Sequence, residues 1–294
     1  MKKSFEFYHA DSLLKMKELK PESVNCILTD PPYKYLKNQK LEIDFDEIIF
    51  FNEVKRVLKK NGFIILFGRG TSFYRWNTML ADMGFVFKEE IVWDKSYTSS
   101  PVHVLNRVHE TISIHTKLSG TLNSIKIPYL EQKSENFEGI ISDIKRIKSA
   151  LNNEKSFDSI IDYLKTGLRN DFETKRTSNF NTSLQTKALG RQEVNTMMAI
   201  KEGMKEKSII KALREHYKLI HPTQKPVRLL ERLLALVSKE GDLILDPFSG
   251  SGSTAIACAN MSRNFIGYEI DHEYFTKATE RIKSVEPLLF SGCL

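Results

Sequence analysis

Residues 243–254 read LILDPFSGSGST, an apolar run followed by a glycine-rich loop and the start of a helical pattern. The apolar run 243–245 is typical of a buried strand, and the helical pattern continues to Asn260. Backbone N–H groups in such a loop and at a helix N-terminus favour a nucleotide-like ligand. Glu269 ends the next predicted strand, 265–268, where a carboxylate can accept both hydroxyl hydrogens of a ribose. The stretch therefore predicts an α/β fold with a nucleotide site.

The glycine spacing leaves two alternatives open. Gly250-x-Gly252-x-x-Ala255 fits a relaxed dinucleotide fingerprint, which would indicate an oxidoreductase, and a tight glycine turn without any ligand is the other possibility. The place of the loop in the chain argues against the oxidoreductase. Only about forty residues follow the loop, enough for two strands and two helices, so most of the sheet must precede it. The order of elements is therefore permuted, with the second half of the sheet first.

The N-terminal part of the chain supplies the missing strands. Strand patterns at 24–29, 62–67, 85–93 and 110–115 are interrupted by helical stripes at 45–60 and 72–83. After residue 221 the alternation resumes with helices at 227–238 and up to about residue 283, on either side of the glycine loop. We predict a doubly wound, mostly parallel sheet.

Residues 118–218 lack the alternation of strand and helix patterns found in the rest of the chain, and they predict a mainly helical insert. Helical periodicity occurs at 140–164 and 193–217, and residues 165–220 hold 12 Lys/Arg against 6 Asp/Glu. Segment 174–192 contains four basic residues and no acidic one: Lys175, Arg176, Lys187 and Arg191. These side chains suit phosphate contacts, with neighbouring amides and hydroxyls reading base edges; the alternative is a solvated loop.

Composition adds weaker constraints. The net charge of +7 and the pI near 9.1 favour a polyanionic partner, although a solvated basic surface has the same composition. The three cysteines form no CxxC pair, so neither a zinc site nor a disulfide framework is predicted. The N-terminus lacks the apolar segment of a signal peptide, and no run of about 18 apolar residues occurs. We expect a soluble, cytoplasmic protein with no membrane-spanning segment and no bound metal.

A second motif, Asp30-Pro31-Pro32-Tyr33, directly follows the predicted strand 24–29. Two prolines alone would indicate a stiffened turn. An acid and an aromatic residue around the prolines suit a different task, which is to activate the exocyclic amine of a nucleobase. Such an amine is a poor nucleophile by itself. A carboxylate and the Pro31 carbonyl can accept its N–H groups and localise its lone pair, while an aromatic ring stacks on the base.

Four motifs in this order resemble the β-order amino-methyltransferases of DNA, which make N6-methyladenine or N4-methylcytosine. The motifs are DPPY at 30–33, HPTQKP at 221–226, DPFSGSGST at 246–254 and GYEID at 267–271. In that family the catalytic motif comes first, the target-recognition region lies in the middle and the cofactor loop comes last. The resemblance covers nearly all of the chain outside 118–218 and implies a circularly permuted S-adenosylmethionine-dependent methyltransferase fold with a seven-stranded sheet.

The resemblance also implies roles for single residues. Asp30, Pro31, Pro32 and Tyr33 would act on a base flipped out of the duplex. The residues expected at the cofactor are Asp11, Thr223, Lys225, Asp246, Phe248, Ser249, Gly250, Gly252 and Glu269. A lysine at a helix start is the other interpretation of Lys225. His109, His115 and His221 are expected to be structural.

The resulting hypothesis is a site-specific DNA methyltransferase that transfers a methyl group from S-adenosylmethionine to N6 of adenine in duplex DNA. Residues 1–117 and 219–294 would form the catalytic domain, and 118–218 the target-recognition region. In the family, Asp at the first position of the tetrapeptide mostly accompanies adenine, and Ser mostly accompanies cytosine. The alternatives are an N4-cytosine enzyme, an RNA methyltransferase, a dinucleotide oxidoreductase and a non-catalytic DNA-binding module. The resemblance suggests a homodimer and a partner restriction endonuclease.

Overall fold

The computed structural model describes residues 4–33, 44–96, 108–133, 136–152, 158, 161, 165–167, 191–213 and 219–285. The chain divides into two compact units. Met1–Asn123 and Lys207–Leu294 together form the first, here called the sheet unit, and Ser124–Glu206 forms the second, the insert unit. Each is described by itself.

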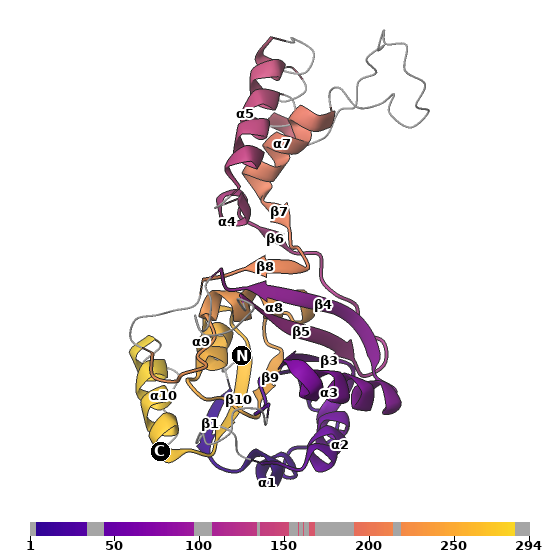
Figure 1. The fold of residues 1–294 in the computed structure, drawn as a ribbon, viewed down its shortest axis with the longest axis vertical. Helices are drawn as coiled ribbons and strands as arrows, with labels where there is room; N and C mark the ends of the chain where they lie inside the picture. Colours follow the sequence, from indigo (N-terminus) through magenta and orange to yellow (C-terminus); the bar gives the residue numbers. More distant parts are fainter. Residues whose placement is uncertain are drawn as a thin grey trace. The chain divides into compact units, whose positions relative to one another are not determined.

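The sheet unit is built on eight described strands in the order β1-β10-β9-β2-β3-β5-β4-β8 (Figure 1). Strand β5 runs antiparallel to both of its neighbours, and the other pairs are parallel. The strands are β1 Phe5–His9, β2 Val24–Thr29, β3 Leu58–Gly68, β4 Val86–Asp94, β5 His109–Thr116, β8 Ile209–Lys211, β9 Leu243–Asp246 and β10 Asn264–Glu269. The predicted mostly parallel α/β sheet is confirmed, with one short edge strand, β8, beyond the seven predicted.

The permuted chain order is visible at the centre of the sheet. Strand β2, from the N-terminal part, pairs with β9, which leads into the glycine loop, and Ile27 lies opposite Leu245. All four strands that carry the predicted motifs or flank them, β1, β10, β9 and β2, are parallel neighbours. Their carboxyl ends therefore meet at one edge of the sheet, the usual ligand edge of an open α/β fold.

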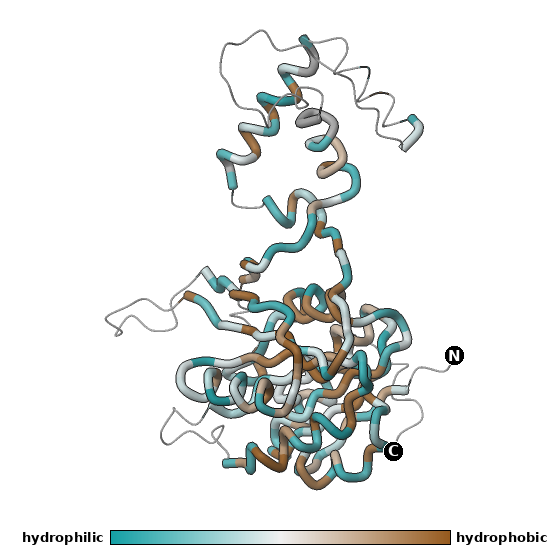
Figure 2. The backbone as a smooth tube through the Cα atoms, turned by 90° about the vertical axis from the view of Figure 1, so that its right-hand side faces the viewer, coloured by the Kyte–Doolittle hydropathy of each residue, from teal (hydrophilic) through white to brown (hydrophobic). Residues whose placement is uncertain are grey.

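Helices cover both faces of this sheet (Figure 1). One face carries α1 Ser12–Met16, α2 Glu47–Val57 and α3 Gly70–Asp82, and the other carries α8 Val227–Val237, α9 Ser253–Asn260 and α10 His272–Val285. Apolar segments are concentrated in the interior of the unit (Figure 2). Ile27, Phe50, Leu66 and Trp76 are among the side chains that the core buries completely or almost completely. The doubly wound arrangement is thus confirmed.

The insert unit is mainly helical. It contains α4 Tyr129–Lys133, α5 Phe137–Leu151 and α7 Arg191–Glu202, with a small antiparallel pair of β6 Lys126–Ile127 and β7 Met204–Lys205. Of the helical periodicity predicted at 193–217, the part up to Glu202 is confirmed as helix, and the described residues that follow, 203–213, are not helical. Gly203 has a φ of +86°, and a Cβ there would lie 2.5 Å from the Ile127 carbonyl oxygen, so the helix ends where the chain meets β6.

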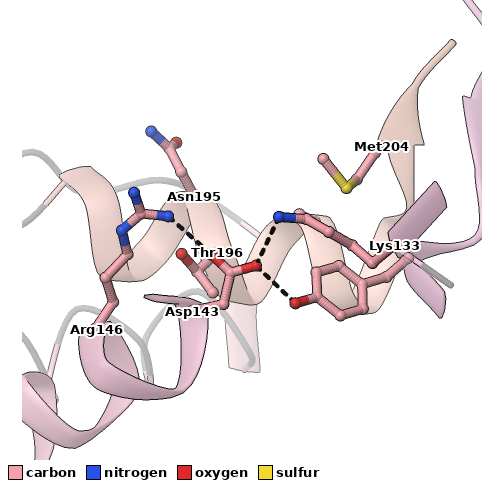
Figure 3. A pocket seen from close by; sticks show the side chains of 8 residues that line it. Lys133, Asp143, Arg146, Asn195, Thr196 and Met204 are labelled. Carbon is pink, nitrogen blue, oxygen red and sulfur yellow. Dashed lines mark hydrogen bonds and ion pairs between the residues drawn. The ribbon is translucent and has the colours of Figure 1, made fainter. Parts of the chain in front are cut away.

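A polar cluster links the helices of the insert unit (Figure 3). Asp143 on α5 is buried, and its carboxylate accepts a 2.6 Å hydrogen bond from the Tyr129 hydroxyl. The same carboxylate pairs with Lys133 at 3.2 Å and Arg146 at 2.8 Å. Beside it lies a cavity of about 280 Å³, also lined by Asn195 of α7. Because these partners of Asp143 come from both α4 and α5, the cluster connects the two helices.

Within the described ranges, no helix is both long and apolar enough to span a lipid bilayer. In the same part of the chain, no group of three His, Cys, Asp or Glu side chains is suited to hold a metal ion. Cys26 and Cys258 are buried free thiols.

Candidate active site

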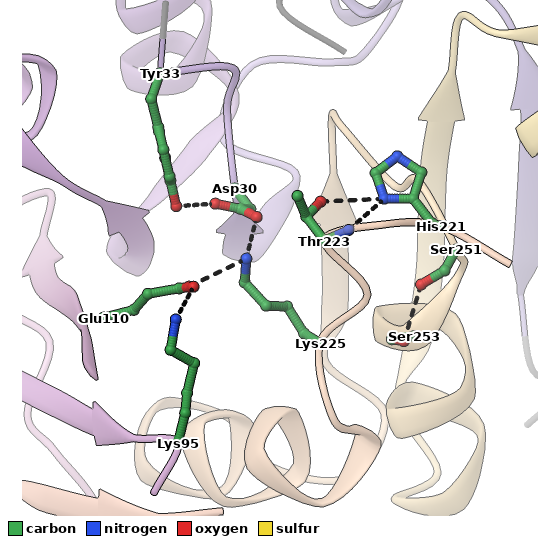
Figure 4. Close-up of polar contacts among 9 residues, drawn as sticks. All are labelled: Asp30, Tyr33, Lys95, Glu110, His221, Thr223, Lys225, Ser251 and Ser253. Atoms are coloured by element: carbon green, nitrogen blue, oxygen red, sulfur yellow. Dashed lines mark hydrogen bonds and ion pairs between the residues drawn. The ribbon is translucent and has the colours of Figure 1, made fainter. Parts of the chain in front are cut away.

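Asp30 lies at the ligand edge of the sheet, immediately after β2, and both of its carboxylate oxygens have partners (Figure 4). Oδ1 accepts a hydrogen bond from the Tyr33 hydroxyl, and Oδ2 contacts the ammonium group of Lys225. Tyr33 is held in turn by α3, because its carbonyl accepts a 2.7 Å hydrogen bond from the Ser72 hydroxyl and its ring lies 6.0 Å from that of Trp76. The DPPY tetrapeptide is therefore fixed to both sheet and helix.

Lys225 bridges Asp30 to a second carboxylate, Glu110. The Lys225 Nζ lies 3.3 Å from Oε2 of Glu110, and the other oxygen of Glu110, Oε1, accepts a 3.0 Å hydrogen bond from Lys95. The sheet topology explains this meeting. Because β5 is antiparallel to its neighbours, it begins at the edge where β2 and β4 end, so Glu110 near its start lies close to Asp30 and Lys95.

These four groups form an alternating row of charges with little access to water. The side chains of Asp30, Lys225, Glu110 and Lys95 are 21%, 10%, 17% and 6% exposed. Burial raises the pKa of Asp30, an effect that the Lys225 ammonium opposes. Burial also disfavours ionisation of Glu110, but the charges of Lys225 and Lys95 outweigh it and lower the pKa of Glu110 to about 2.

Lys225 keeps its positive charge in this setting. Burial alone would favour the neutral amine, yet the carboxylates of Asp30 and Glu110 raise its pKa to about 12. The ammonium group also lies 5.1 Å from the ring centroid of Phe67 and 5.9 Å from that of Trp93, distances typical of cation–π contacts. Lys225 is therefore a permanent cation beside Asp30 and is unsuited to be a base near neutral pH.

The glycine loop follows β9 and leads into α9. Asp246 is buried, accepts a 3.2 Å hydrogen bond from the Phe248 N–H, and has its pKa raised to about 7 by burial. The Ser249 hydroxyl donates back to the Asp246 carbonyl at 2.9 Å. Gly250 and Gly252 have φ values of +47° and +70°, a region that favours glycine. The loop turns sharply at these two glycines, directly before the N-terminus of α9.

Glu269, at the end of β10, faces this loop. Its Oε2 accepts the Gly250 N–H at 2.7 Å, and its Oε1 accepts the Asp271 N–H at 2.8 Å. The Ile270 N–H also interacts with this carboxylate. A carboxylate offers about four acceptor sites, so it can still accept a hydrogen bond from a ribose hydroxyl. These acceptor oxygens beside the glycine loop fit an adenosine-containing cofactor such as S-adenosylmethionine.

Comparison with known proteins agrees with this geometry. The family described as DNA methylase matches residues 24–280. The chain belongs to the DNA methylase family. The predicted resemblance to DNA amino-methyltransferases is thus confirmed, and so is the methyltransferase type of the fold.

Individual relatives of this methylase cover most of its length. It is 27% identical to the Type II methyltransferase M2.DpnII of Streptococcus pneumoniae, over 94% of this chain and 88% of the relative. It is 25% identical to the Type II methyltransferase M.HpaI of Haemophilus parainfluenzae, over 94% and 73%. Among solved structures, the M1.HpyAVI–SAM complex matches with a TM-score of 0.54 at 22% identity, covering 94% of this chain and 99% of that one. The cytosine-N4-specific PvuII DNA methyltransferase gives 0.58 at 14% identity, covering 99% and 96%.

Two further predicted cofactor residues of the methylase lie at the same edge. The Asp11 carboxylate caps α1 by accepting the Leu13 N–H at 2.8 Å, two residues beyond His9, which is paired with Glu269. Thr223 is exposed, and its hydroxyl lies 3.1 Å from Nδ1 of His221. Their assignment to the cofactor stays a prediction.

Three residues near the site were not among the sequence candidates. Lys95 and Glu110 complete the charge row, and His221 lies against the glycine loop, since a Cβ on Gly250 would be 3.5 Å from its ring. The His221 ring also packs at 4.3 Å on Tyr274, and burial lowers its pKa to about 4. The position of His221 in the HPTQKP motif was the sequence signal that could have placed it at the site. Lys95 and Glu110 belong to none of the motifs quoted above.

The candidate phosphate-binding residues fall mostly outside the described residues. Lys175, Arg176 and Lys187 lie in the undescribed segment 168–190. Arg191 is the first residue of α7, and only its backbone is described. Their role in DNA binding therefore stays a prediction.

Proposed function

We propose that this DNA methylase transfers a methyl group from S-adenosylmethionine to N6 of adenine in a specific duplex DNA sequence. The observation that carries the proposal is the Asp30 carboxylate, fixed between the Tyr33 hydroxyl and the Lys225 ammonium at the same sheet edge as Glu269 and the glycine loop. The solved relative M1.HpyAVI was crystallised with SAM, in agreement with the cofactor predicted here.

The residues around Asp30 suit activation of an exocyclic amine. A target base flipped out of the duplex would stack on the Tyr33 ring and donate its N–H groups to Asp30 and the Pro31 carbonyl. These contacts localise the nitrogen lone pair. The cofactor supplies a methyl group on a sulfonium centre. The nitrogen would form a bond to that carbon as the carbon–sulfur bond breaks, and the amine would then give up a proton. Asp30 is placed to take it, because burial raises its pKa.

Cofactor binding is assigned to the glycine-loop side of the edge. Glu269 would hold the ribose, and Asp246, Phe248, Ser249, Gly250 and Gly252 shape the adjoining loop. Asp11 would face the adenine from the end of β1, and Thr223 the methionine end. For Lys225, the contacts with Asp30 and Glu110 support a role in activating the amine in addition to the cofactor contact expected from its motif.

Adenine is favoured over cytosine by Asp30 at the first position of the tetrapeptide. The fold does not separate the two substrates, because the PvuII enzyme, which is cytosine-N4-specific, shares it. Both amines would meet the same three groups, so the chemistry argued above holds for either base.

Sequence selection is assigned to the insert, residues 118–218, with Lys175, Arg176, Lys187 and Arg191 on phosphates. The relatives M2.DpnII and M.HpaI are Type II methyltransferases, which supports a place in a restriction-modification system with a partner endonuclease. A homodimer is a further prediction from the resemblance.

The deciding experiment combines methyl transfer with nucleoside analysis. Purified protein is incubated with methyl-labelled S-adenosylmethionine and plasmid DNA from a methylation-free host, and the product is digested to nucleosides. We expect label in N6-methyladenine. Label in N4-methylcytosine would contradict the adenine assignment alone, and transfer to structured RNA in preference to duplex DNA would contradict the substrate. No transfer to any DNA, with a folded Asp30→Ala variant that binds cofactor equally well, would contradict the proposed function.

A further inference from the structure

We propose that Glu110 is a positioning residue for methyl transfer: it receives the Lys225 ammonium when Asp30 accepts a hydrogen of the target amine, and Lys95 holds Glu110 in place. This inference rests on the proposed role of Asp30. It adds two residues that belong to no motif of the chain, Glu110 at the second position of β5 and Lys95 directly after β4.

The first step of the argument is that both carboxylate oxygens of Asp30 have partners before any substrate binds. Tyr33 donates to Oδ1 and Lys225 contacts Oδ2. A target amine must therefore share or replace one of these contacts. Lys225 is the stronger competitor, because an ammonium group binds a carboxylate more tightly than a neutral amine does.

The second step is that Lys225 cannot simply be released. Its side chain is only 10% exposed, and leaving an unpaired ammonium group in such a site is strongly unfavourable. A nearby acceptor must take it. Oε2 of Glu110 lies 3.3 Å from Lys225 Nζ, and this buried oxygen has no hydrogen-bond partner among the residues that the structure describes. This oxygen is already ion-paired with Lys225 but accepts no close hydrogen bond, so it can take up the ammonium group more fully.

The third step is that Glu110 is anchored by its other oxygen. Lys95 donates to Oε1 at 3.0 Å and is itself buried. The backbone of Lys95 is fixed as well, because its N–H donates to the Val108 carbonyl at 2.7 Å. Glu110 can therefore bind Lys225 more closely through Oε2 without leaving its place. The Lys225 ammonium group lies between the two carboxylates (Figure 4), so a small movement would exchange the two arrangements.

Aromatic rings support the cation along this movement. Lys225 Nζ lies near the faces of Phe67 and Trp93, and Lys95 Nζ lies 5.7 Å from the Trp93 ring centroid. Attraction to a ring face does not depend on one hydrogen-bond direction, so it persists while Lys225 shifts between carboxylates.

Several charges face Asp30, and they set what the test should show. Lys225 comes from the loop before α8, Glu110 from β5, Asp246 from β9, and Tyr33 from the tetrapeptide itself. The negative charge of Glu110 raises the pKa of Asp30, while Lys225 lowers it. Lys95 acts on Asp30 through Glu110. Removing Glu110 and removing Lys95 should therefore shift the titration of Asp30 in opposite directions.

The test is the pH dependence of single-turnover methyl transfer by full-length Glu110→Gln and Lys95→Met. With Gln at 110, Lys225 stays on Asp30 and competes with the amine. We expect the plateau rate to fall about 10- to 100-fold and the acid limb of the pH profile to move to lower pH. With Met at 95, Glu110 draws Lys225 away from Asp30, so the acid limb should move to higher pH. Cofactor affinity, measured by calorimetry, should stay within about twofold of wild type in both.

Control variants separate positioning from folding. Glu90→Gln removes an exposed carboxylate on the neighbouring strand, opposite Ser113 of β5, and should leave the rate and its profile unchanged. Glu110→Asp keeps the charge and should retain more activity than Glu110→Gln. Should Glu110→Gln fail to fold, Glu110→Asp and Lys95→Met still carry the comparison.

Two outcomes would overturn the inference: wild-type rates in Glu110→Gln, or acid limbs that move in the same direction in Glu110→Gln and Lys95→Met. Both presuppose that the wild type methylates DNA and Asp30→Ala does not. Absence of transfer by the wild type would instead overturn the proposed function, so the two failures are distinct.

Discussion

The ammonium group of Lys225 contacts the carboxylate of Asp30 although 195 positions separate the two residues in the chain. The contact arises because β9, which comes after the Lys225 loop, lies directly beside β2, which ends immediately before Asp30. The permuted order thus brings Lys225 of the HPTQKP motif into contact with Asp30 of the DPPY motif. The cation opposes the effect of burial on the pKa of Asp30 and so favours the ionised carboxylate, which is the state needed to accept an N–H group.

Replacing Lys225 tests this relationship directly. In Lys225→Met the pKa of Asp30 should rise further, because burial is then no longer opposed by the ammonium group. We expect single-turnover methyl transfer near pH 7 to fall by about 100-fold or more and to recover partly at higher pH. Cofactor affinity should change much less.

Lys225→Arg, which keeps the charge, should retain part of the activity, and Lys239→Met on the surface serves as the matched control. A large loss of cofactor affinity with an unchanged rate at saturation would instead assign Lys225 to the cofactor.

Much of the sheet unit could be predicted from the sequence. The apolar pattern at 24–29 coincides with β2, and the helix and strand around the glycine loop lie within a residue or two of α9 and β10. These elements are buried on both faces and bounded by glycine, proline or a charged residue, so local pattern and tertiary structure agree.

The rest depends on pairing partners that a local pattern does not contain. Strand β8 has three residues and forms by pairing with β4, so its two isoleucines fitted a helical pattern equally well. Glu110 and Lys95 were missed for a similar reason. Only the antiparallel register of β5, with Glu110 opposite Trp93, brings their side chains to the carboxyl ends of the parallel strands.

Glu269 should determine cofactor affinity. Glu269→Gln keeps the shape but replaces one acceptor oxygen by an N–H₂ donor, which cannot accept both the Gly250 N–H and a ribose hydroxyl. We expect the dissociation constant for S-adenosylmethionine, measured by calorimetry, to rise about 10-fold or more. Glu273→Gln, an exposed change four residues along the chain, should leave it unaltered. Equal affinities in the two variants would contradict the assignment of Glu269 to the ribose.

Gly252 is constrained by both conformation and space. Its φ is +70°, and a Cβ there would lie 2.8 Å from Cδ1 of Ile282 on α10. Gly252→Ala should therefore lower the free energy of unfolding by about 1–2 kcal/mol for the left-handed backbone, and further for the displaced side chain.

Gly241→Ala isolates the backbone contribution, because Gly241 has a φ of +81° but a Cβ there would meet no atom within 4 Å. Urea denaturation of both variants should show the larger loss for Gly252→Ala. Equal losses of unfolding free energy in the two variants would mean that the Ile282 side chain of α10 moves aside without destabilising the protein.

His115 should make the stability of the protein depend on pH. The residue is buried on β5 against Phe87, its Nδ1 has no hydrogen-bond partner within the described chain, and burial lowers its pKa to about 4 from the usual 6.5. Below pH 6.5 the imidazole of His115 is protonated in the unfolded chain, whereas in the folded chain it is protonated only below about pH 4. The free energy of unfolding should therefore fall by about 1–2 kcal/mol between about pH 7 and pH 5 on account of this residue, and level off below about pH 4.

His115→Leu removes the titrating imidazole and places an apolar side chain of similar size against Phe87. Its free energy of unfolding should be within about 1 kcal/mol of wild type near neutral pH, and it should lose less stability on acidification, as measured by urea denaturation at both pH values. His109→Gln, a change at the exposed start of the same strand, provides the comparison. An unchanged pH dependence in His115→Leu would show that other groups, such as His221, account for the loss.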